Sequence, residues 1–354
     1  MIERLMPTGD DTSSASESVG HELSNSANVQ QDQARNTLEA DIRDSEEALG
    51  IRTTPARLIE AGLAIDKKFF DVAIITGQPE KPERIFGDKE WAGHLAARLL
   101  ARQYGHQPLT TDFILALHQR FLDKIEPGEV SIIVHEPGRG GQYLEGRHAS
   151  ITCSDTQIAA IRSNPLLRFE TDKGSDDPNT GFIEYPVMPK QERRQRLDEI
   201  CVQFNTDNQA INRDPYGNAA LLQRRCMSLH PLSVDFNGRT LRVLKNWALE
   251  NAGENPSIVD DVDGDLFLSE EGWVESVRAG SMRYAEYKRR AEAGESDPIV
   301  LFGLGQKRLR YEELLSASDD LPPPLVGNGW HDHSQYEKFL ARLGTMAQDS
   351  RSQP

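Results

Sequence analysis

Cysteine pairs, long apolar runs and an excess of basic charge are all missing from this sequence of 354 residues. The three cysteines, Cys153, Cys201 and Cys226, lie far apart and form no CxxC pair, so we expect neither a disulfide framework nor a zinc site. No apolar run reaches the roughly 20 residues that span a bilayer. The N-terminus shows no basic segment followed by a hydrophobic one. These absences predict a soluble protein that works in a reducing compartment.

The charge balance excludes two classes of partner. The chain has 40 Lys and Arg residues against 56 Asp and Glu residues, which gives a formal net charge of −16. Nucleic acids and anionic membranes are bound through basic surfaces. We therefore expect neither a nucleic acid nor a membrane as the principal partner.

The chain divides into four parts. Residues 1–35 are polar, with few large apolar side chains to offset the entropy of ordering, so we expect a disordered leader. A helical segment (36–85), a core (86–255) and a helical C-terminal extension (256–354) with a Pro-rich linker follow. The leader suits the secretion signal of a bacterial effector and equally a flexible tail. A cytoplasmic location and secretion into a host cell both stay open.

Most of the chain after the leader has the apolar spacing of helices. We predict helices over residues 36–50, 54–70, 91–104, 110–122, 189–204, 214–226, 239–252, 273–293, 307–315 and 334–343. Two short β-prone segments, Val130–His135 and Arg147–Thr152, flank a glycine-rich run and predict a β-hairpin. Residues 171–181 are expected to form an inserted polar loop, and the acidic run Asp260–Asp265 a surface loop.

The central stretch runs from Asp214 to Ala252 and places a polar loop between two predicted helices. The amides at the start of the second helix carry partial positive charge and can bind phosphate oxygens. Gly238 lets a phosphate approach the backbone closely. Arg239 and Arg242 are three positions apart, so they share one helix face, and each can donate two hydrogen bonds to phosphate oxygens.

The same loop carries a carboxylate and an imidazole. Asp235 can hold Mg²⁺, since this ion is usually bound by one or two carboxylates together with the substrate's own phosphates. His230 can act as a general base, because an imidazole near its ordinary pKa can take a proton from an attacking hydroxyl. The stretch as a whole predicts chemistry on a phosphate ester.

These residues, HPLSVDFNGRTLR, resemble the signature of the Fic/Doc proteins, His-Pro-Phe-x-Asp/Glu-Gly-Asn-Gly-Arg-x-x-Arg. Most members of that family transfer AMP, or another nucleotide or phosphate moiety, to a protein hydroxyl. The resemblance implies that His230 is the general base and Asp235 the Mg²⁺ ligand. It implies that Asn237 and Gly238 form a phosphate cradle, and that Arg239 and Arg242 bind the β and γ phosphates of ATP or another nucleotide.

The resemblance also implies a fold and a partner. We expect a mainly α fold, with a Fic-type helical core and a β-hairpin flap that binds a segment of the target protein by strand addition. Gly141 and Tyr143 resemble residues of that flap. The expected partner is a protein with an exposed Ser, Thr or Tyr hydroxyl.

The sequence departs from this signature at three positions. One extra residue lies between His230 and Asp235, Leu232 replaces Phe, and Phe236 stands where the family has Gly or Ala. The bulky Phe236 either bulges outward together with the extra residue or reshapes the nucleotide pocket. Three functions stay open: transfer of a nucleoside monophosphate, transfer of a phosphoryl group, and a Fic-shaped binding or scaffold protein without catalysis.

Overall fold

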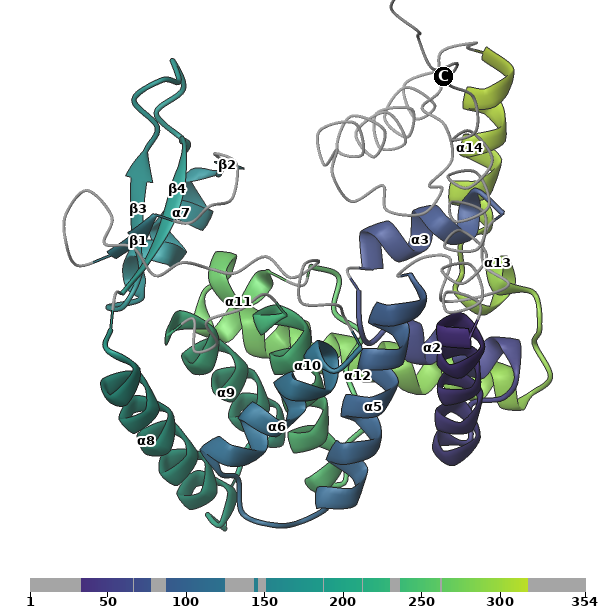
Figure 1. The fold of residues 1–354 in the computed structure, drawn as a ribbon. Coiled ribbons are helices and arrows are strands. Elements are labelled where there is room, and N and C mark those ends of the chain that lie inside the picture. The colour runs from purple at the N-terminus through teal and green to yellow at the C-terminus, as the bar shows by residue number, and fades with distance from the viewer. Residues whose placement is uncertain are drawn as a thin grey trace, which may run out of the picture.

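The computed structural model describes residues 33–65, 67–77, 87–124, 143–145, 151–186, 188–211, 213–229, 236–261 and 263–317. Within these ranges the chain is mainly helical with a small antiparallel sheet, as predicted (Figure 1). Residues 1–32 of the predicted leader, the first strand of the predicted hairpin, the Pro-rich linker and the last predicted helix lie outside the described residues, and residues 33–35 are helical. The helices predicted near 36–50, 91–104, 110–122, 189–204, 214–226, 239–252, 273–293 and 307–315 are confirmed.

The larger core is built around one helix that is buried on nearly all sides. α10 (Asn237–Asn251) contacts α5 (Asp88–Tyr104), α6 (Thr111–Leu122) and α9 (Pro215–Leu229), and α9 contacts α8 (Lys190–Asn208). Leu241, Val243, Leu244, Trp247 and Leu249 of α10 are all buried, which is the pattern of a central helix rather than a surface one. The start of α10 is therefore rigidly placed.

The sheet lies at one end of this helical core (Figure 1). β4 (Thr180–Pro186) pairs antiparallel with β1 (Tyr143–Glu145), β2 (Ile151–Thr152) and β3 (Arg168–Thr171). α7 (Asp155–Ser163) and the short α11 (Gly264–Phe267) pack with the sheet around a separate apolar cluster. The predicted loop 171–181 is the connection between β3 and β4. Strand character at the end of the predicted Arg147–Thr152 segment is confirmed by β2.

The chain's two ends share a second core. α2 (Thr54–Ala61) and α3 (Lys67–Ile75) lie beside α12 (Glu270–Glu292), α13 (Pro298–Leu301) and α14 (Gly305–Ala317), the purple and yellow-green helices of Figure 1. Phe302 packs edge-on against Phe70 and Tyr287, with ring centroids 4.9 and 4.8 Å away. Segments that are far apart in sequence thus bury one apolar surface together.

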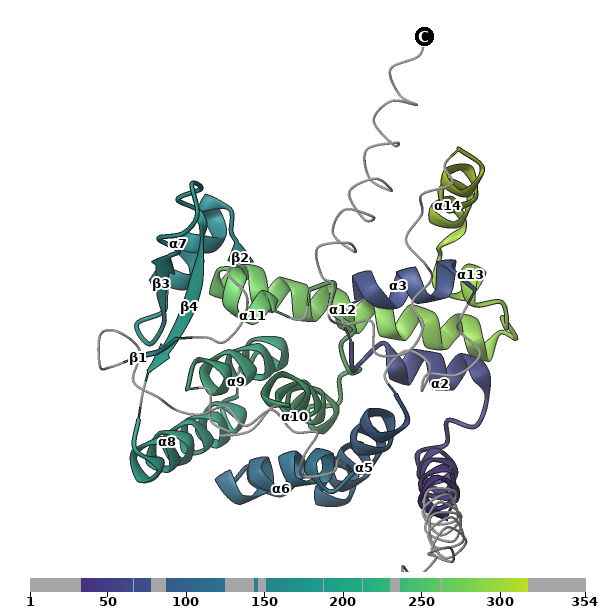
Figure 2. The ribbon, with the colours of Figure 1, turned by 45° about the horizontal axis from the view of Figure 1, so that its top comes forward.

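α12 connects the two cores (Figure 2). At its beginning Trp273 is fully buried against α9, and its indole Nε1 donates to the carbonyl of Ala220 at 2.9 Å. Farther along, Tyr287 belongs to the core formed by the two ends of the chain. None of the helices in the described part of the chain is both long and apolar enough to cross a bilayer.

Two sequence-based predictions are wrong in detail. The single helix predicted over 54–70 is two helices, because the chain turns after Ala61 at the buried residues Leu63, Ala64 and Ile65. The acidic run 260–265 is not simply a surface loop, since Asp265 is buried on α11. The acidic composition of this run predicts exposure, but one of its carboxylates, Asp265, faces the core.

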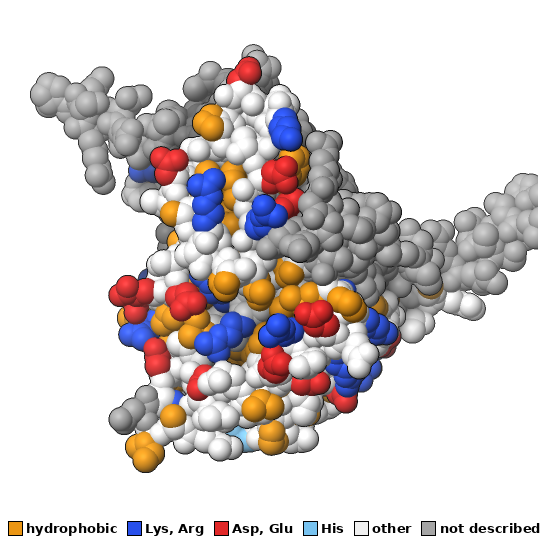
Figure 3. Space-filling model, turned by 90° about the vertical axis from the view of Figure 1, so that its left-hand side faces the viewer, with side chains coloured by type: hydrophobic (Ala, Val, Ile, Leu, Met, Phe, Trp, Pro, Cys, Tyr) orange, Lys and Arg blue, Asp and Glu red, His pale blue; other side chains and the backbone are white. Residues whose placement is uncertain are grey.

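Charge on the face that carries the sheet and α8 is mixed (Figure 3). Basic and acidic side chains alternate there, and some form exposed pairs such as Arg196 with Glu199 and Arg194 with Asp112. Such pairs contribute little to stability, because water screens them. They leave no strongly basic patch on this face, consistent with the overall negative charge.

Candidate functional site

The start of α10 is the structural centre of the candidate site. Asn237 is its first residue, and the carbonyl of Phe236 accepts the first helical hydrogen bond from the amide of Thr240 at 2.9 Å. A phenyl side chain at the residue before the helix cannot accept hydrogen bonds from the first amides, as Ser or Asp would. Phe236 therefore provides no side-chain cap to the start of this helix.

Phe236 enters α10 in a left-handed conformation, with φ 79° and ψ 10°. This conformation is unfavourable for a residue with a side chain and easy for glycine. The ring is buried and stacks on Phe121 of α6, with centroids 5.6 Å apart and planes 11° from parallel. The ring therefore does not bulge outward, as one of the two alternatives for this residue had it, but turns into the core. Packing energy offsets the backbone cost.

Arg242 is held above the start of its own helix. Its Nε donates to the backbone carbonyl of Ala64 at 3.0 Å, and the side chain is largely buried. A Cβ added to Gly238 would lie 3.2 Å from Nη1 of Arg242. The guanidinium thus lies close to Gly238, in the first turn of α10. This is the placement that a phosphate site requires.

Arg239 is half-buried and already has an anionic partner. Its Nη2 lies 3.2 Å from Oε2 of Glu90, in the first turn of α5. Its guanidinium also lies over the ring of Phe236, 4.8 Å from the centroid. A phosphate that binds Arg239 must compete with the Glu90 carboxylate.

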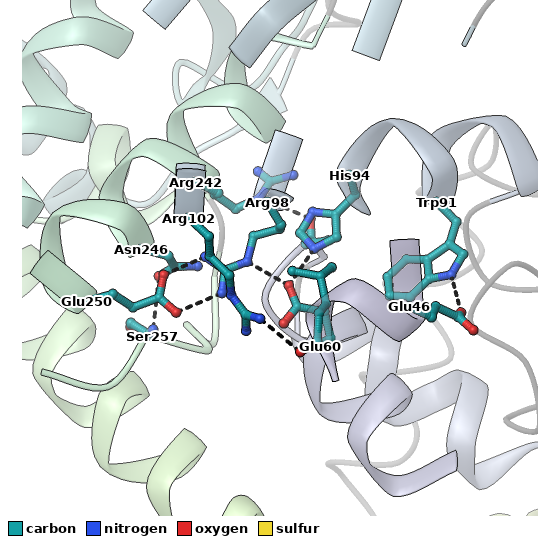
Figure 4. A network of polar contacts seen from close by, with 12 residues as sticks. Glu46, Glu60, Trp91, His94, Arg98, Arg102, Arg242, Asn246, Glu250 and Ser257 are labelled. Atoms are coloured by element: carbon teal, nitrogen blue, oxygen red, sulfur yellow. Dashed lines mark hydrogen bonds and ion pairs between the residues drawn. The ribbon is translucent and has the colours of Figure 1, made fainter. Parts of the chain in front are cut away.

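A buried network ties α10 to α2 and α5 (Figure 4). Arg98 donates from Nε to Oε1 of Glu60 at 2.7 Å, and from Nη1 and Nη2 to the carboxylate of Glu250 at 2.7 and 2.9 Å. Nε2 of His94 lies 3.1 Å from Oε1 of Glu60. Burial raises the pKa of Glu60, but Arg98 and His94 outweigh it and lower that pKa to about 2. The carboxylate is therefore ionised at neutral pH.

A second buried polar group lies one turn beyond Arg242. Lys245 is fully buried, and its Nζ lies 5.6 Å from the centre of the Trp273 ring. Burial, with Arg242 nearby, lowers the pKa of Lys245 to about 7. Burial and Asp263 raise the pKa of Asp265 to about 7, although Nε2 of Gln223 donates to Oδ2 of Asp265 at 2.9 Å. An amine and a carboxyl with similar proton affinity thus adjoin the candidate site.

Several predicted residues are not placed. His230, Asp235 and Gly141 lie outside the described residues, and for Tyr143 only the backbone of β1 is described. The roles of base, metal ligand and flap therefore stay predictions. Asn237, Gly238, Arg239 and Arg242 do lie together at the start of α10. Within the described ranges no group of three or more His, Cys, Asp or Glu residues offers another metal site.

Sequence patterns did not single out two further groups at this site. Glu90 is an acidic residue in the first turn of a helix, which is common and indicates no particular partner. The Ala64 carbonyl is a backbone group, and no pattern of side chains predicts that it binds Arg242. The turn after α2, which the sequence-based prediction missed, leaves backbone carbonyls without helical partners, and the Ala64 carbonyl is one of them.

Comparisons with known proteins give likenesses to solved structures only. No protein-family model matches the sequence, and no curated protein matches it either. Among solved structures, the chain is similar to a Fic domain containing signaling protein from Bacteroides thetaiotaomicron. The two share 14% sequence identity with a TM-score of 0.40, over 75% of this chain and 97% of the other. At that level the likeness carries no argument about function, which rests on the residues described above.

Proposed function

We propose that this protein transfers a nucleoside monophosphate, with AMP from ATP as the first candidate, to a Ser, Thr or Tyr hydroxyl of a target protein. One observation carries the proposal: Arg242 is held by the Ala64 carbonyl with Nη1 beside Gly238, in the first turn of α10. A guanidinium and helix-start amides at one point form a site for a phosphate chain. The order of His230, Asp235 and Arg239 along the sequence supports the same function.

The proposed reaction needs a base, an anion site and a leaving group. The target hydroxyl oxygen attacks the α phosphorus of ATP, and its proton passes to the His230 imidazole. The bond between the α phosphorus and the bridging oxygen breaks, and pyrophosphate leaves. Gly238, Arg239 and Arg242 bind the departing phosphates, whose negative charge grows as that bond breaks.

Magnesium fits the proposed donor set. Asp235 would hold the ion, and one carboxylate with phosphate oxygens is a common set for Mg²⁺. When bound, the ion supplies charge neutralisation to the phosphates. The remaining positive charge at the site comes from the protein itself, through Arg239 and Arg242.

Labelled nucleotide tests the proposal. The purified protein is incubated with Mg²⁺, a lysate, and ATP labelled on either the α or the γ phosphate. We expect the α label alone on protein, and its loss in His230→Ala but not in His106→Ala, a matched change at an exposed histidine after α5. Transfer of the γ label alone would indicate phosphoryl transfer instead. ATP binding without transfer of either label would indicate a binding protein.

A further inference from the structure

The acceptor that holds Arg242 belongs to a different part of the chain. Ala64 follows α2, and 178 positions separate it from Arg242. Its carbonyl accepts from Nε, and Nη1 of the same guanidinium lies beside Gly238. The segment that ends α2 thus determines where this guanidinium lies.

The Ala64 carbonyl is itself fixed by a buried turn. The amides of Leu63 and Ala64 donate to the carbonyls of Glu60 and Ala61, each at 3.0 Å. Leu63, Ala64 and Ile65 are all buried. The turn begins at Glu60, whose carboxylate is hydrogen-bonded to Arg98 and His94 of α5. The position of the carbonyl is therefore coupled to a buried ionic network.

The same network is joined to α10 at its far end. Arg98 makes two hydrogen bonds to Glu250, in the last turn of α10. α2 and α10 are thus connected twice, through Arg242 and Ala64 at one end and through Glu60, Arg98 and Glu250 at the other (Figure 4). Two connections at separate points fix both the distance and the angle between the helices.

Fixing Arg242 matters because its side chain is long. A free arginine loses about 2 kcal/mol of rotamer entropy when a ligand immobilises it. A guanidinium that is already held gives up little on binding, which increases affinity. His94 adds no further positive charge, because burial lowers its pKa and a neutral imidazole can still donate Nε2–H to Glu60.

We propose that the turn Glu60–Ala64 is a positioning element of the phosphate site: its buried Glu60 anchor holds the Ala64 carbonyl, which aims Arg242 at the terminal phosphates of the nucleotide. This inference rests on the proposed function. It assigns to the N-terminal helical segment the selection of a nucleoside triphosphate over a monophosphate. The signature residues alone do not set that selectivity.

Binding measurements by calorimetry test this role in the full-length protein. Dissociation constants for ATP and AMP are measured without Mg²⁺, for wild type, Arg242→Ala and Glu60→Gln. We expect wild type to prefer ATP by about tenfold, the size of a hydrogen-bonded charge contact. Glu60→Gln should lower this preference by about threefold or more, toward that of Arg242→Ala, because the anchor loses its charge.

Glu46→Gln is the matched control. Glu46 is a buried carboxylate that joins the N-terminal segment to α5, through Nε1 of Trp91 at 3.0 Å and Nε of Arg57 at 2.8 Å. These hydrogen bonds lead to Trp91 and Arg57 rather than to the turn Glu60–Ala64, so loss of the Glu46 charge should lower the unfolding temperature and leave the ATP preference unchanged. If Glu60 has only a structural role, Glu60→Gln will also lower the unfolding temperature and leave the ATP preference unchanged. That result would overturn the inference.

A second variant, Ala64→Gly, tests the same role in case Glu60→Gln does not fold. Ala64→Gly keeps the carbonyl and the ionic network but loosens the backbone that carries it. The ATP preference should again fall, and an unchanged preference would count against the inference. If wild type shows no preference for ATP, or Arg242→Ala leaves it intact, the proposed function itself fails. A preference that survives Glu60→Gln and Ala64→Gly overturns only the positioning role.

Discussion

Gly238 is the residue at which stability and binding should separate. An added methyl group would lie 3.2 Å from Nη1 of Arg242, so the guanidinium must shift by a few tenths of an ångström. Alanine also favours helix over glycine by about 1 kcal/mol. We predict that Gly238→Ala raises the unfolding temperature or leaves it unchanged, and weakens ATP binding about tenfold because one charged contact is lost.

The matched control is Gly305→Ala. Gly305 begins α14 as Gly238 sits at the beginning of α10, but an added Cβ there meets no atom within 4 Å. Its substitution should stabilise the protein with no change in ATP affinity. Thermal unfolding and a nucleotide titration of the two variants make the comparison. Equal ATP affinities for both would contradict the placement of Arg242.

At position 236 a glycine substitution should cost less stability than an alanine substitution, which is the reverse of their usual order. Its left-handed backbone penalises any side chain by roughly 1–2 kcal/mol, whereas loss of a buried phenyl costs about 3–5 kcal/mol. Both Phe236→Ala and Phe236→Gly should therefore destabilise the protein. The glycine variant should be the more stable by about 1 kcal/mol, since it alone relieves the backbone. Chemical denaturation of the two variants checks this, and a more stable alanine variant would contradict it.

The sequence alone predicted the helix start that carries the candidate site residues, but not the surroundings of these residues. The spacing of Asn237, Gly238, Arg239 and Arg242 predicts one helix start, which the structure confirms. The left-handed Phe236 was unforeseen, because an aromatic residue gives no local signal for that conformation. The partners Glu90 and Ala64 were also unforeseen, because contacts between distant segments depend on packing that no local pattern specifies.

At the scale of helices, α5 presents an acidic first turn to the start of α10. The Glu90 carboxylate is paired with Arg239, with both side chains about one-quarter exposed. A phosphate must displace it, and two negative charges near one arginine repel each other. We predict that Glu90→Gln raises ATP affinity by about threefold or more, because that competition is removed.

Titrations at low and high salt check the prediction. The gain should shrink as salt rises, because a partly exposed charge is screened. Glu199→Gln is the control, since Glu199 forms an exposed pair with Arg196 on α8, outside the candidate site. If Glu90→Gln weakens ATP binding, the carboxylate instead supports the site by orienting Arg239.

At the scale of the whole molecule, stability should depend on pH through Lys245 and Asp265. Asp265 has a folded pKa of about 7, above its ordinary 3.8, so its contribution is favourable below pH 4 and is lost as pH rises to 7. Lys245 has a folded pKa of about 7, below its ordinary 10.5, so its contribution is favourable above pH 10.5 and is lost as pH falls to 7. The two contributions together are least favourable near neutral pH.

The double variant Lys245→Met with Asp265→Asn should therefore be stabilised most near pH 7 and least at pH 4 and pH 10. The free energy of unfolding, measured by denaturant at each pH, reports this difference from wild type. Asp260→Asn is the control, because Asp260 is an exposed carboxylate that pairs with Arg283 and should shift the profile little. A difference from wild type that does not vary with pH would contradict the account.

The arrangement of the chain's ends was the part of the fold least accessible from sequence. Helical periodicity predicts most of the helices, because each one buries an apolar face. It does not say that α2 and α3 pack with α12, α13 and α14, since that choice depends on complementary shapes across more than 200 positions, as between Phe70 and Phe302. The short strands β1, β3 and β4 were missed for a related reason: their pairing around β4 gives them stability that their sequences do not announce.

A crystal structure of the protein with Mg²⁺ and a non-hydrolysable ATP analogue tests the central claim most directly. We predict that the terminal phosphates lie at the start of α10, within hydrogen-bonding distance of the Gly238 amide and the Arg242 guanidinium, with Glu90 displaced from Arg239. The α phosphate should face the His230 imidazole. A nucleotide bound elsewhere, or a helix start that stays closed by the Arg239–Glu90 pair at saturating nucleotide, would contradict the account.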